Sequence, residues 1–182
     1  RDSKLYFYDL NAKANYKLND RNWVYASGYF GTDKLGFGNS FGIDWGNATG
    51  TLRWNHIYST RLFANTSLIY SNYRYNIGIG SGDQAINIAS RIKDWNLKQD
   101  YELYANGRNT VRFGWNVIHH TIVPGAVTAG SDAAIGDVSL QERYGWEGAA
   151  YVSHEHRFSE KLNLKYGLRL STFTQVRPGT VN

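Results

Sequence analysis

Polar and apolar residues alternate along much of the chain, and this period of two is the feature that most restricts its fold. In residues 8–18 the even positions carry Tyr, Leu or Ala, whereas the odd positions from Asn11 to Lys17 are Asn or Lys. Successive side chains of a β-strand point to opposite faces, so a segment of this kind has one apolar and one polar face. The alternation predicts strands that separate an apolar environment from water.

The alternation recurs along the chain and predicts eight strands. They cover residues 8–18, 23–30, 47–55, 62–71, 94–103, 111–117, 143–152 and 162–170, and in 23–30 the two faces are hard to tell apart. Short connections fall at 19–22, 59–61, 106–108 and 159–161, and longer ones, rich in Gly, Ser and Asp, fall near 32–41, 78–90 and 121–141. Pro124 and Pro178 lie at the long-loop end, where we expect them to interrupt no ladder. We therefore predict an all-β, antiparallel fold with short turns at one end and long loops at the other.

Composition excludes several classes of protein. The 182 residues are long enough for one domain, and the absence of Cys rules out disulfides, thiol catalysis and cysteine-held zinc. The mean hydropathy is -0.50, and no apolar run reaches the ~20 residues of a membrane-spanning helix. Strands of a membrane barrel still fit this value, because their two faces average to a polar hydropathy. The 20 Lys and Arg residues are scattered singly, which argues against nucleic-acid binding.

Two patterns favour a transmembrane barrel over a soluble up-and-down barrel such as a lipocalin, which also alternates. The charged face of residues 94–102, with Asp, Asn, Lys, Asp and Glu, suits a water-filled lumen better than an apolar interior. Aromatic residues also gather beside the short turns, as in an interfacial girdle. These aromatic residues are Tyr16, Trp23, Tyr25, Trp54, Tyr58, Tyr101, Tyr104, Phe113 and Phe158. We predict an antiparallel transmembrane β-barrel in the bacterial cell outer membrane, in contact with its lipid.

The polar faces of these strands supply candidate residues for a ligand path. The charged ones are Arg53, Asp94, Asp100, Arg112, Arg143, Glu147, Lys165 and Arg169. An unpaired charge in a partly buried wall is costly, so we expect most of them to pair between neighbouring strands. As a set, they mark the predicted lumen.

Two histidine pairs are the best candidates for metal ligands. His154 and His156 share one strand face, about 6.5–7 Å apart, but no third ligand lies nearby, which favours a structural role. His119 and His120 should point to opposite faces at the start of a long loop. We predict no metal or cofactor.

An enzymatic site at the barrel rim is the weakest alternative. Ser131 and Asp132, with His119 or His120, are its nearest candidates, but the loop has no nucleophile motif. The Gly-rich stretch 78–84 follows no βαβ pattern, so a flexible loop explains it better than a phosphate site. We predict that the chain is not an enzyme.

The direction in which each predicted strand crosses the membrane predicts that the chain is part of a larger barrel. The first predicted strand ends at a short turn, so eight strands bring the chain back to the long-loop side. Complete outer-membrane barrels keep both ends at the periplasmic side and finish on a terminal aromatic residue. This chain ends in VRPGTVN, residues 176–182.

Five segments together resemble the middle barrel strands of TonB-dependent receptors, particularly those of Bacteroidetes. They are YDLNAKANYKL (8–18), SGYFGTDKLGFG (27–38), GNATGTLRWNHIYSTRLFANTSLIYSNYRY (46–75), FGWNVIHHTIVPG (113–125) and AAYVSHEHRFSEKLNLKYGLRLSTF (149–173). The resemblance implies a barrel of about 22 strands that imports a scarce nutrient with energy passed from TonB–ExbB–ExbD. It also implies a SusD-like surface lipoprotein as a further partner. Residues 1–182 would then form a single barrel segment without the plug domain.

A self-contained eight-stranded outer-membrane barrel with a structural or adhesive role is the main alternative. Pairing between the first and last strands would favour it, whereas two open edges would favour the larger barrel.

Overall fold

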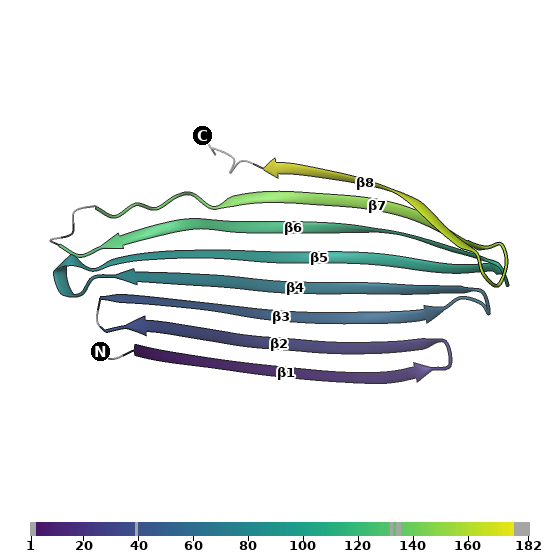
Figure 1. Cartoon of the computed structure of the whole chain (residues 1–182), viewed down its shortest axis with the longest axis horizontal. Coiled ribbons are helices and arrows are strands. Elements are labelled where there is room, and N and C mark those ends of the chain that lie inside the picture. The colour runs from purple at the N-terminus through teal and green to yellow at the C-terminus, as the bar shows by residue number, and fades with distance from the viewer. Residues whose placement is uncertain (1–2, 39, 132, 134–135, 177–182) are drawn as a thin grey trace.

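The computed structural model describes residues 3–38, 40–131, 133 and 136–176, and these form one antiparallel sheet (Figure 1). The eight strands are β1 (Ser3–Asn19), β2 (Asn22–Phe37), β3 (Phe41–Ile57), β4 (Leu62–Ile79), β5 (Ile86–Asn106), β6 (Asn109–Ala129), β7 (Arg143–Arg157) and β8 (Asn163–Val176). A 3₁₀ turn, η1 (Gly82–Gln84), lies between β4 and β5. The predicted all-β, eight-stranded antiparallel fold is confirmed.

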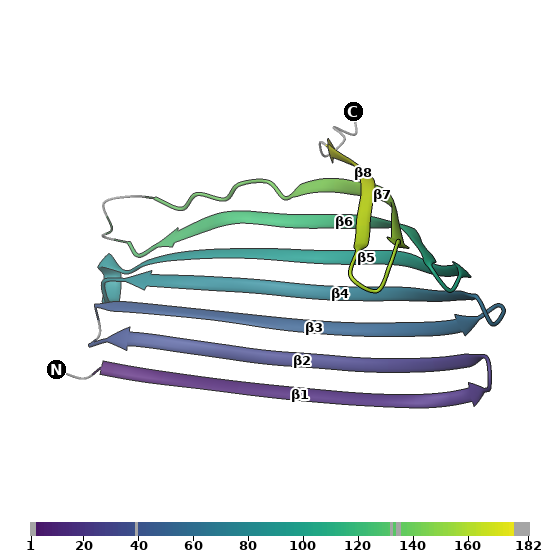
Figure 2. The ribbon, with the colours of Figure 1, turned by 45° about the vertical axis from the view of Figure 1, so that its right-hand side comes forward.

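The strands lie in the sheet in chain order, β1 to β8, and each pairs with the next. The sheet is curved, and the β7–β8 hairpin turns out of the plane of the first strands (Figure 2). Among the described residues β1 and β8 do not pair with each other, so both are edge strands. Each edge therefore presents a row of unpaired main-chain groups.

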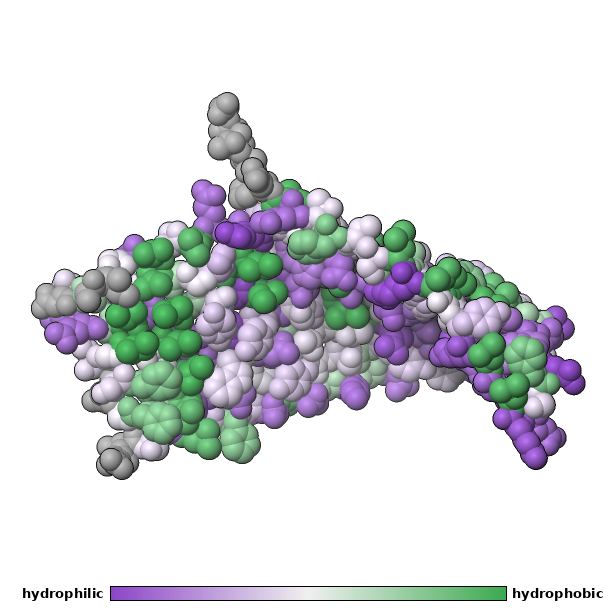
Figure 3. Space-filling view, turned by 45° about the horizontal axis from the view of Figure 1, so that its top comes forward, coloured by the Kyte–Doolittle hydropathy of each residue, from purple (hydrophilic) through white to green (hydrophobic). Residues whose placement is uncertain are grey.

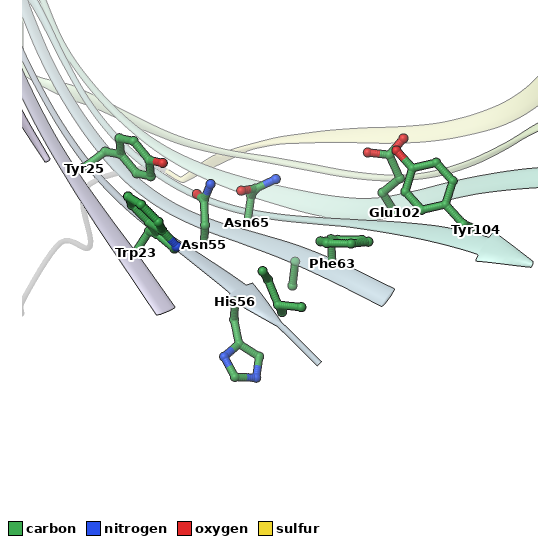
Figure 4. A pocket seen from close by; sticks show the side chains of 10 residues that line it. Trp23, Tyr25, Asn55, His56, Phe63, Asn65, Glu102 and Tyr104 are labelled. Carbon is green, nitrogen blue, oxygen red and sulfur yellow. The ribbon is translucent and has the colours of Figure 1, made fainter. Parts of the chain in front are cut away.

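Strand register divides the side chains between two faces. Figure 4 places Tyr25, Asn65 and Glu102 on the concave side of the sheet and His56 on the convex side. We call these the inner and the outer face. Because side chains alternate along each strand, the register assigns every other strand residue to one face or the other.

The outer face carries a belt of exposed apolar side chains. They include Leu52, Trp54, Leu68, Trp95, Leu97, Trp115, Val117, Trp146 and Val152. On β5 the belt runs from Tyr101, stacked on Phe113, to Trp95, packed against Tyr70. Trp95 and Tyr101 are six positions apart, which corresponds to roughly 20 Å along the strand and is close to the ~25 Å apolar band of an outer-membrane barrel.

Polar side chains within this belt bond to each other. Thr66 Oγ1 donates a hydrogen bond of 2.6 Å to Gln99 Oε1 on the neighbouring strand. In an apolar solvent such groups must be satisfied internally, because no water is present.

The sheet has almost no core of its own. In the described part of the chain the buried hydrophobic residues are Ala64 and Ala149, although 42% of the sequence is hydrophobic. Large side chains such as Leu168, 80% exposed, stay uncovered on the outer face. An apolar surface of this extent needs an apolar partner or solvent.

The predicted long loops are partly wrong, because the strands continue into them. The connections are residues 38–40, 80–85 and 130–142 rather than 32–41, 78–90 and 121–141. Beyond the belt the polarity of the faces reverses, so the alternation that marks the strands is lost. Lys34 and Asp44 point outward there, whereas the inner face becomes apolar. The inner residues at this end include Leu5, Phe7, Leu35, Phe37, Phe41, Ile43, Ile77 and Ile79, and Figure 3 shows them as a green patch at the left.

Pro124 lies within β6 rather than in a loop, which corrects its predicted position. The β5–β6 register shifts between Ala89 and Arg91, opposite this proline. Ser90 Oγ donates a hydrogen bond of 3.0 Å to the carbonyl of Val123. A bulge tolerates a proline because the ladder is already interrupted there. Pro178 lies outside the described residues.

The short turns occur where they were predicted, and two designs alternate among them. Asn19 Oδ1 accepts hydrogen bonds from Arg21 N (3.0 Å) and Asn22 Nδ2 (2.8 Å). Asn106 does the same for Arg108 N (3.0 Å) and Asn109 Nδ2 (2.8 Å). These are the first and third turns.

The second and fourth turns use serine instead. Ser59 Oγ accepts hydrogen bonds from Arg61 N and Leu62 N, both at 3.2 Å. Ser159 Oγ accepts from Lys161 N (3.3 Å) and Leu162 N (3.2 Å). The short-turn end thus repeats one four-strand pattern twice.

Removing the turn acceptor should destabilise the protein. We expect Asn19→Ala and Asn106→Ala each to lower the free energy of unfolding by about 1 kcal/mol, because two donors lose their partner. Asn19→Asp and Asn106→Asp keep the acceptor and should stay close to wild type. Urea unfolding of the purified protein measures the differences, and alanine variants as stable as the aspartates would contradict the turn design.

Candidate functional site

All eight charged residues predicted to line a lumen lie on the inner face. The register places Arg53 opposite Tyr25, Asp100 opposite Asn65 and Arg169 opposite Tyr151. The other members of the set are Asp94, Arg112, Arg143, Glu147 and Lys165. Most of them converge on β5 to β8.

Arg112 on β6 joins both neighbouring strands. Its Nη2 lies 2.7 Å from Glu102 Oε1 on β5, and its Nη1 lies 2.9 Å from Glu155 Oε2 on β7. Asn163 Nδ2 of β8 donates a further hydrogen bond of 2.7 Å to Glu155. The planar guanidinium presents its donors as a fixed fork, so one arginine can hold two carboxylates. Four strands are linked by this network.

Asp100 anchors a second group of polar side chains. Tyr151 Oη of β7 donates to Asp100 Oδ1 at 2.6 Å, and Lys98 Nζ lies 2.9 Å from Asp100 Oδ2. To reach β5 the Tyr151 side chain crosses β6 at Gly114. A Cβ at this glycine would meet the Gln99 carbonyl and lie 3.1 Å from the Tyr151 ring. The missing side chain is therefore what lets Tyr151 lie flat across the strand.

Arg169 extends this polar track to β8. Its Nη2 donates a hydrogen bond of 3.3 Å to Asn116 Oδ1 on β6. The inner face from β5 to β8 is thus hydrogen-bonded across the strands through side chains as well as through the main chain.

His120 lies between two carboxylates on the inner face. Its Nδ1 is 2.8 Å from Asp94 Oδ1, and its Nε2 is 3.7 Å from Glu147 Oε2. The adjacent His119 points outward, as expected, and its ring packs on Trp146 at 4.7 Å. Both lie in the middle of β6 rather than at the start of a loop, because the strand continues to Ala129.

Three members of the predicted set remain outside these networks. Within the described ranges, Arg53, Arg143 and Lys165 form no ion pair, and all three are exposed. Lys165 lies opposite Glu155, but that carboxylate is already paired with Arg112, so the three cations leave positive charge on the inner face.

A hollow of about 350 Å³ lies at the short-turn end, mostly on the inner face (Figure 4). Aromatic rings and polar groups line it together. Its inner-face residues are Trp23, Tyr25, Asn55, Ile57, Phe63, Asn65, Glu102 and Tyr104. Aromatic rings beside amide and carboxylate groups can hold a ligand that is partly flat and partly polar.

Sequence reasoning assigned Trp23, Tyr25 and Tyr104 to the interfacial girdle, and this was wrong. Their register places them on the inner face, whereas Trp54 and Tyr101 do point outward. The tight first turn could have predicted the inward position of Trp23, because it fixes which residues of the two strands lie opposite each other. It pairs Lys17, on the polar face of β1, with Trp23.

The outward pair His154 and His156 converges on one amide at the short-turn end. His154 Nε2 lies 2.9 Å from Asn109 Oδ1, and His156 Nδ1 contacts the same oxygen. His154 Nδ1 is also 2.8 Å from the Tyr166 hydroxyl. They share the face of Val152, as predicted, and connect the β5–β6 turn to β7 and β8.

The described residues contain no group of three or more His, Cys, Asp or Glu side chains placed to hold a metal ion. In the same residues, no helix has the length and apolar character needed to cross a bilayer.

No protein-family model and no curated protein sequence matches the chain. Among solved structures, the chain is similar to BauA, the ferric preacinetobactin receptor from Acinetobacter baumannii, with a TM-score of 0.66 and 11% sequence identity. The match covers 96% of this chain and 34% of the receptor chain, so this chain spans about a third of that protein's length. At this identity the likeness establishes the fold alone, an antiparallel sheet similar to about a third of that receptor chain.

Closing the space at Gly114 should disturb the inner face. We expect Gly114→Ala to lower the free energy of unfolding by about 1–3 kcal/mol, because the new methyl group collides with the Gln99 carbonyl and the Tyr151 ring. Gly50→Ala, at another strand glycine, is the control, since nothing lies within 4 Å of its added Cβ. Equal stabilities of the two variants in urea unfolding would contradict this packing.

Proposed function

We propose that the chain forms part of the wall of an outer-membrane transporter of the TonB-dependent receptor type, along whose inner face a nutrient is imported. The observation that carries the proposal is the opposite chemistry of the two faces of a single sheet. A sheet of this kind fits between lipid on its outer side and water on its inner side.

The outer face fits a hydrocarbon environment. Leu68 and Trp115, for example, are 42% and 41% exposed, and no second layer of the described structure covers them. Their polar neighbours Thr66 and Gln99 bond to each other, as lipid-facing groups must.

The two open edges support a wall that extends beyond these eight strands. Unpaired edges at β1 and β8 would be unstable within a bilayer, which contains no water to satisfy main-chain groups. We propose that further strands pair there, in a barrel of about 22 strands of which residues 1–182 are one segment. A self-contained eight-stranded barrel would require β1 to pair with β8, which the described residues do not do.

The ligand path in this proposal is the inner face. The cations Arg53, Arg143 and Lys165 give it positive charge, which favours a ligand with anionic groups. The ligand would first meet the apolar patch at the long-loop end and then the polar networks. Ferric chelates are the first ligands to test, because BauA is a ferric preacinetobactin receptor.

The partners follow from the transporter type. We propose TonB–ExbB–ExbD as the energy source, outer-membrane lipid around the belt, and a Bacteroidetes-type SusD-like lipoprotein as a lid. We also propose that the chain is not an enzyme. His120 contacts Asp94 and Glu147, and His119 packs on Trp146. Asp132 of the candidate rim enzyme lies outside the described residues.

The proposal is tested by blocking the inner face in living cells. Residues 1–182 contain no Cys, so a single introduced thiol is the only reactive site of that kind in this segment. Tyr73 on the inner face of β4 is 41% exposed, and Leu68 on the outer face of the same strand is 42% exposed. We expect a bulky, charged thiol reagent to stop TonB-dependent growth on the imported nutrient in Tyr73→Cys cells and to spare Leu68→Cys cells.

The control is a strain that lacks the gene. It should lose growth on one nutrient whose uptake also requires TonB, and wild-type protein should restore it only when TonB is present. A deletion strain that grows like its parent on every TonB-dependent nutrient would contradict the transport role.

A further inference from the structure

Basic side chains gather on the outer face directly beyond the apolar belt, toward the long-loop end. The group, here called the basic rim, consists of Lys4, Lys34, Arg74, Arg91 and Lys93. Arg74 on β4 and Arg91 and Lys93 on β5 are its centre. The inward-facing ligand path contains none of these residues.

Successive outward pairs of the β4–β5 ladder change from apolar residues in the belt to basic residues in the rim. Leu68 lies opposite Leu97, and Tyr70 lies opposite Trp95, with their rings 4.8 Å apart. The next two outward pairs are Asn72 with Lys93 and Arg74 with Arg91. An apolar pair, an aromatic pair and then cations are the order expected where a strand leaves lipid hydrocarbon for the headgroup layer.

The pairing of Arg74 with Arg91 is unfavourable in isolation. Like charges directly opposite each other on two strands destabilise a sheet. In the described ranges none of the five cations of the basic rim forms an ion pair. The nearby outward carboxylate, Asp44, accepts a hydrogen bond from Asn76 at 3.3 Å instead. A bound anion between the arginines would offset their repulsion.

The height of the cations matches lipid headgroups. Lys93 lies two residues beyond Trp95 and Arg91 lies four, which corresponds to roughly 7 Å and 13 Å along the strand. Strand tilt shortens these heights above the aromatic ring, and the headgroup layer is roughly 5–8 Å thick on each side of the bilayer. Lysine and arginine side chains can bend back to reach that layer.

The surface beside Arg74 is open enough to admit a ligand group. A small outer-face hollow reaches from Phe30 to Arg74 over Gly46 and Ala48. At Gly46 a Cβ would lie 3.5 Å from Arg74 Nε, so the glycine leaves the guanidinium accessible from this side. Guanidinium groups bind phosphate through paired donors.

We propose that the basic rim binds the phosphate group of an anionic outer-leaflet lipid, whose acyl chains lie along the apolar belt below it. The inference rests on the proposed function, because it requires the sheet to cross the outer membrane with its long-loop end outward. Phosphate is the anion that the paired arginines fit best, and the adjoining belt binds the acyl chains that a free ion lacks.

The test compares lipids retained by the membrane-extracted protein. Wild-type protein is incubated in nanodiscs of phosphatidylglycerol and phosphatidylcholine in equal amounts, and native mass spectrometry counts the lipids that remain bound. We expect a preference for phosphatidylglycerol that falls about tenfold to thirtyfold in Arg74→Gln/Arg91→Gln. Arg74→Lys/Arg91→Lys keeps both charges and should keep most of the preference.

The matched control removes two cations from the inner face. Lys13→Gln/Arg53→Gln should retain the wild-type preference, because both side chains point away from lipid. An unchanged preference in Arg74→Gln/Arg91→Gln, or an equal loss in the control, would overturn the inference. So would binding of inorganic phosphate through the same arginines without any preference between the lipids. Extracted protein that retains no lipid of either kind would instead overturn the membrane proposal itself.

Discussion

The main-chain ladder between neighbouring strands is the interaction on which the rest of this structure depends. Neighbouring strands pair along most of their length, from β1–β2 to β7–β8, which satisfies the main-chain groups between the two edges without any covering layer. Every strand side chain then points either to the inner or to the outer face. The position of a residue along its strand determines the face, so a sequence that alternates with a period of two forms a sheet with two different surfaces.

The two surfaces are held in different ways. The outer belt offers apolar side chains to its surroundings and bonds its few polar groups internally, as Thr66 and Gln99 do. The inner face is tied across strands by charged groups, with Arg112 between Glu102 and Glu155 as the most connected example. Both faces change character beyond the belt, where the outer side becomes basic and the inner side apolar. In the proposed function the sheet therefore has a membrane zone and an external zone, and the proposed transport and lipid sites belong to different faces.

The sequence predicted the strands wherever one face meets an apolar environment. Residues 94–103, apart from Gln99, and residues 111–117 alternate, and the short turns carry Asn or Ser at positions with a clear hydrogen-bonding role. Prediction failed between Lys34 and Asp44, because both faces change polarity there and the strands extend beyond the alternating polar and apolar pattern. It also failed at Trp23, because aromatic residues suit either a membrane interface or a wet lumen. The contact of Glu155 with Arg112, 43 residues away in the sequence, could not be predicted, since it depends on the register across the long β6–β7 connection.

The central claim is that lipid touches one face of this sheet and not the other, and the tryptophans of the chain can report on it directly. Trp54, Trp95, Trp115 and Trp146 point outward, whereas Trp23 and Trp45 point inward. Variants that each keep a single tryptophan can be reconstituted in bilayers with brominated acyl chains, which quench fluorescence on contact. Strong quenching of the outward four and little quenching of Trp23 and Trp45 is the predicted result. Equal quenching of both groups, or none of either, would contradict the account.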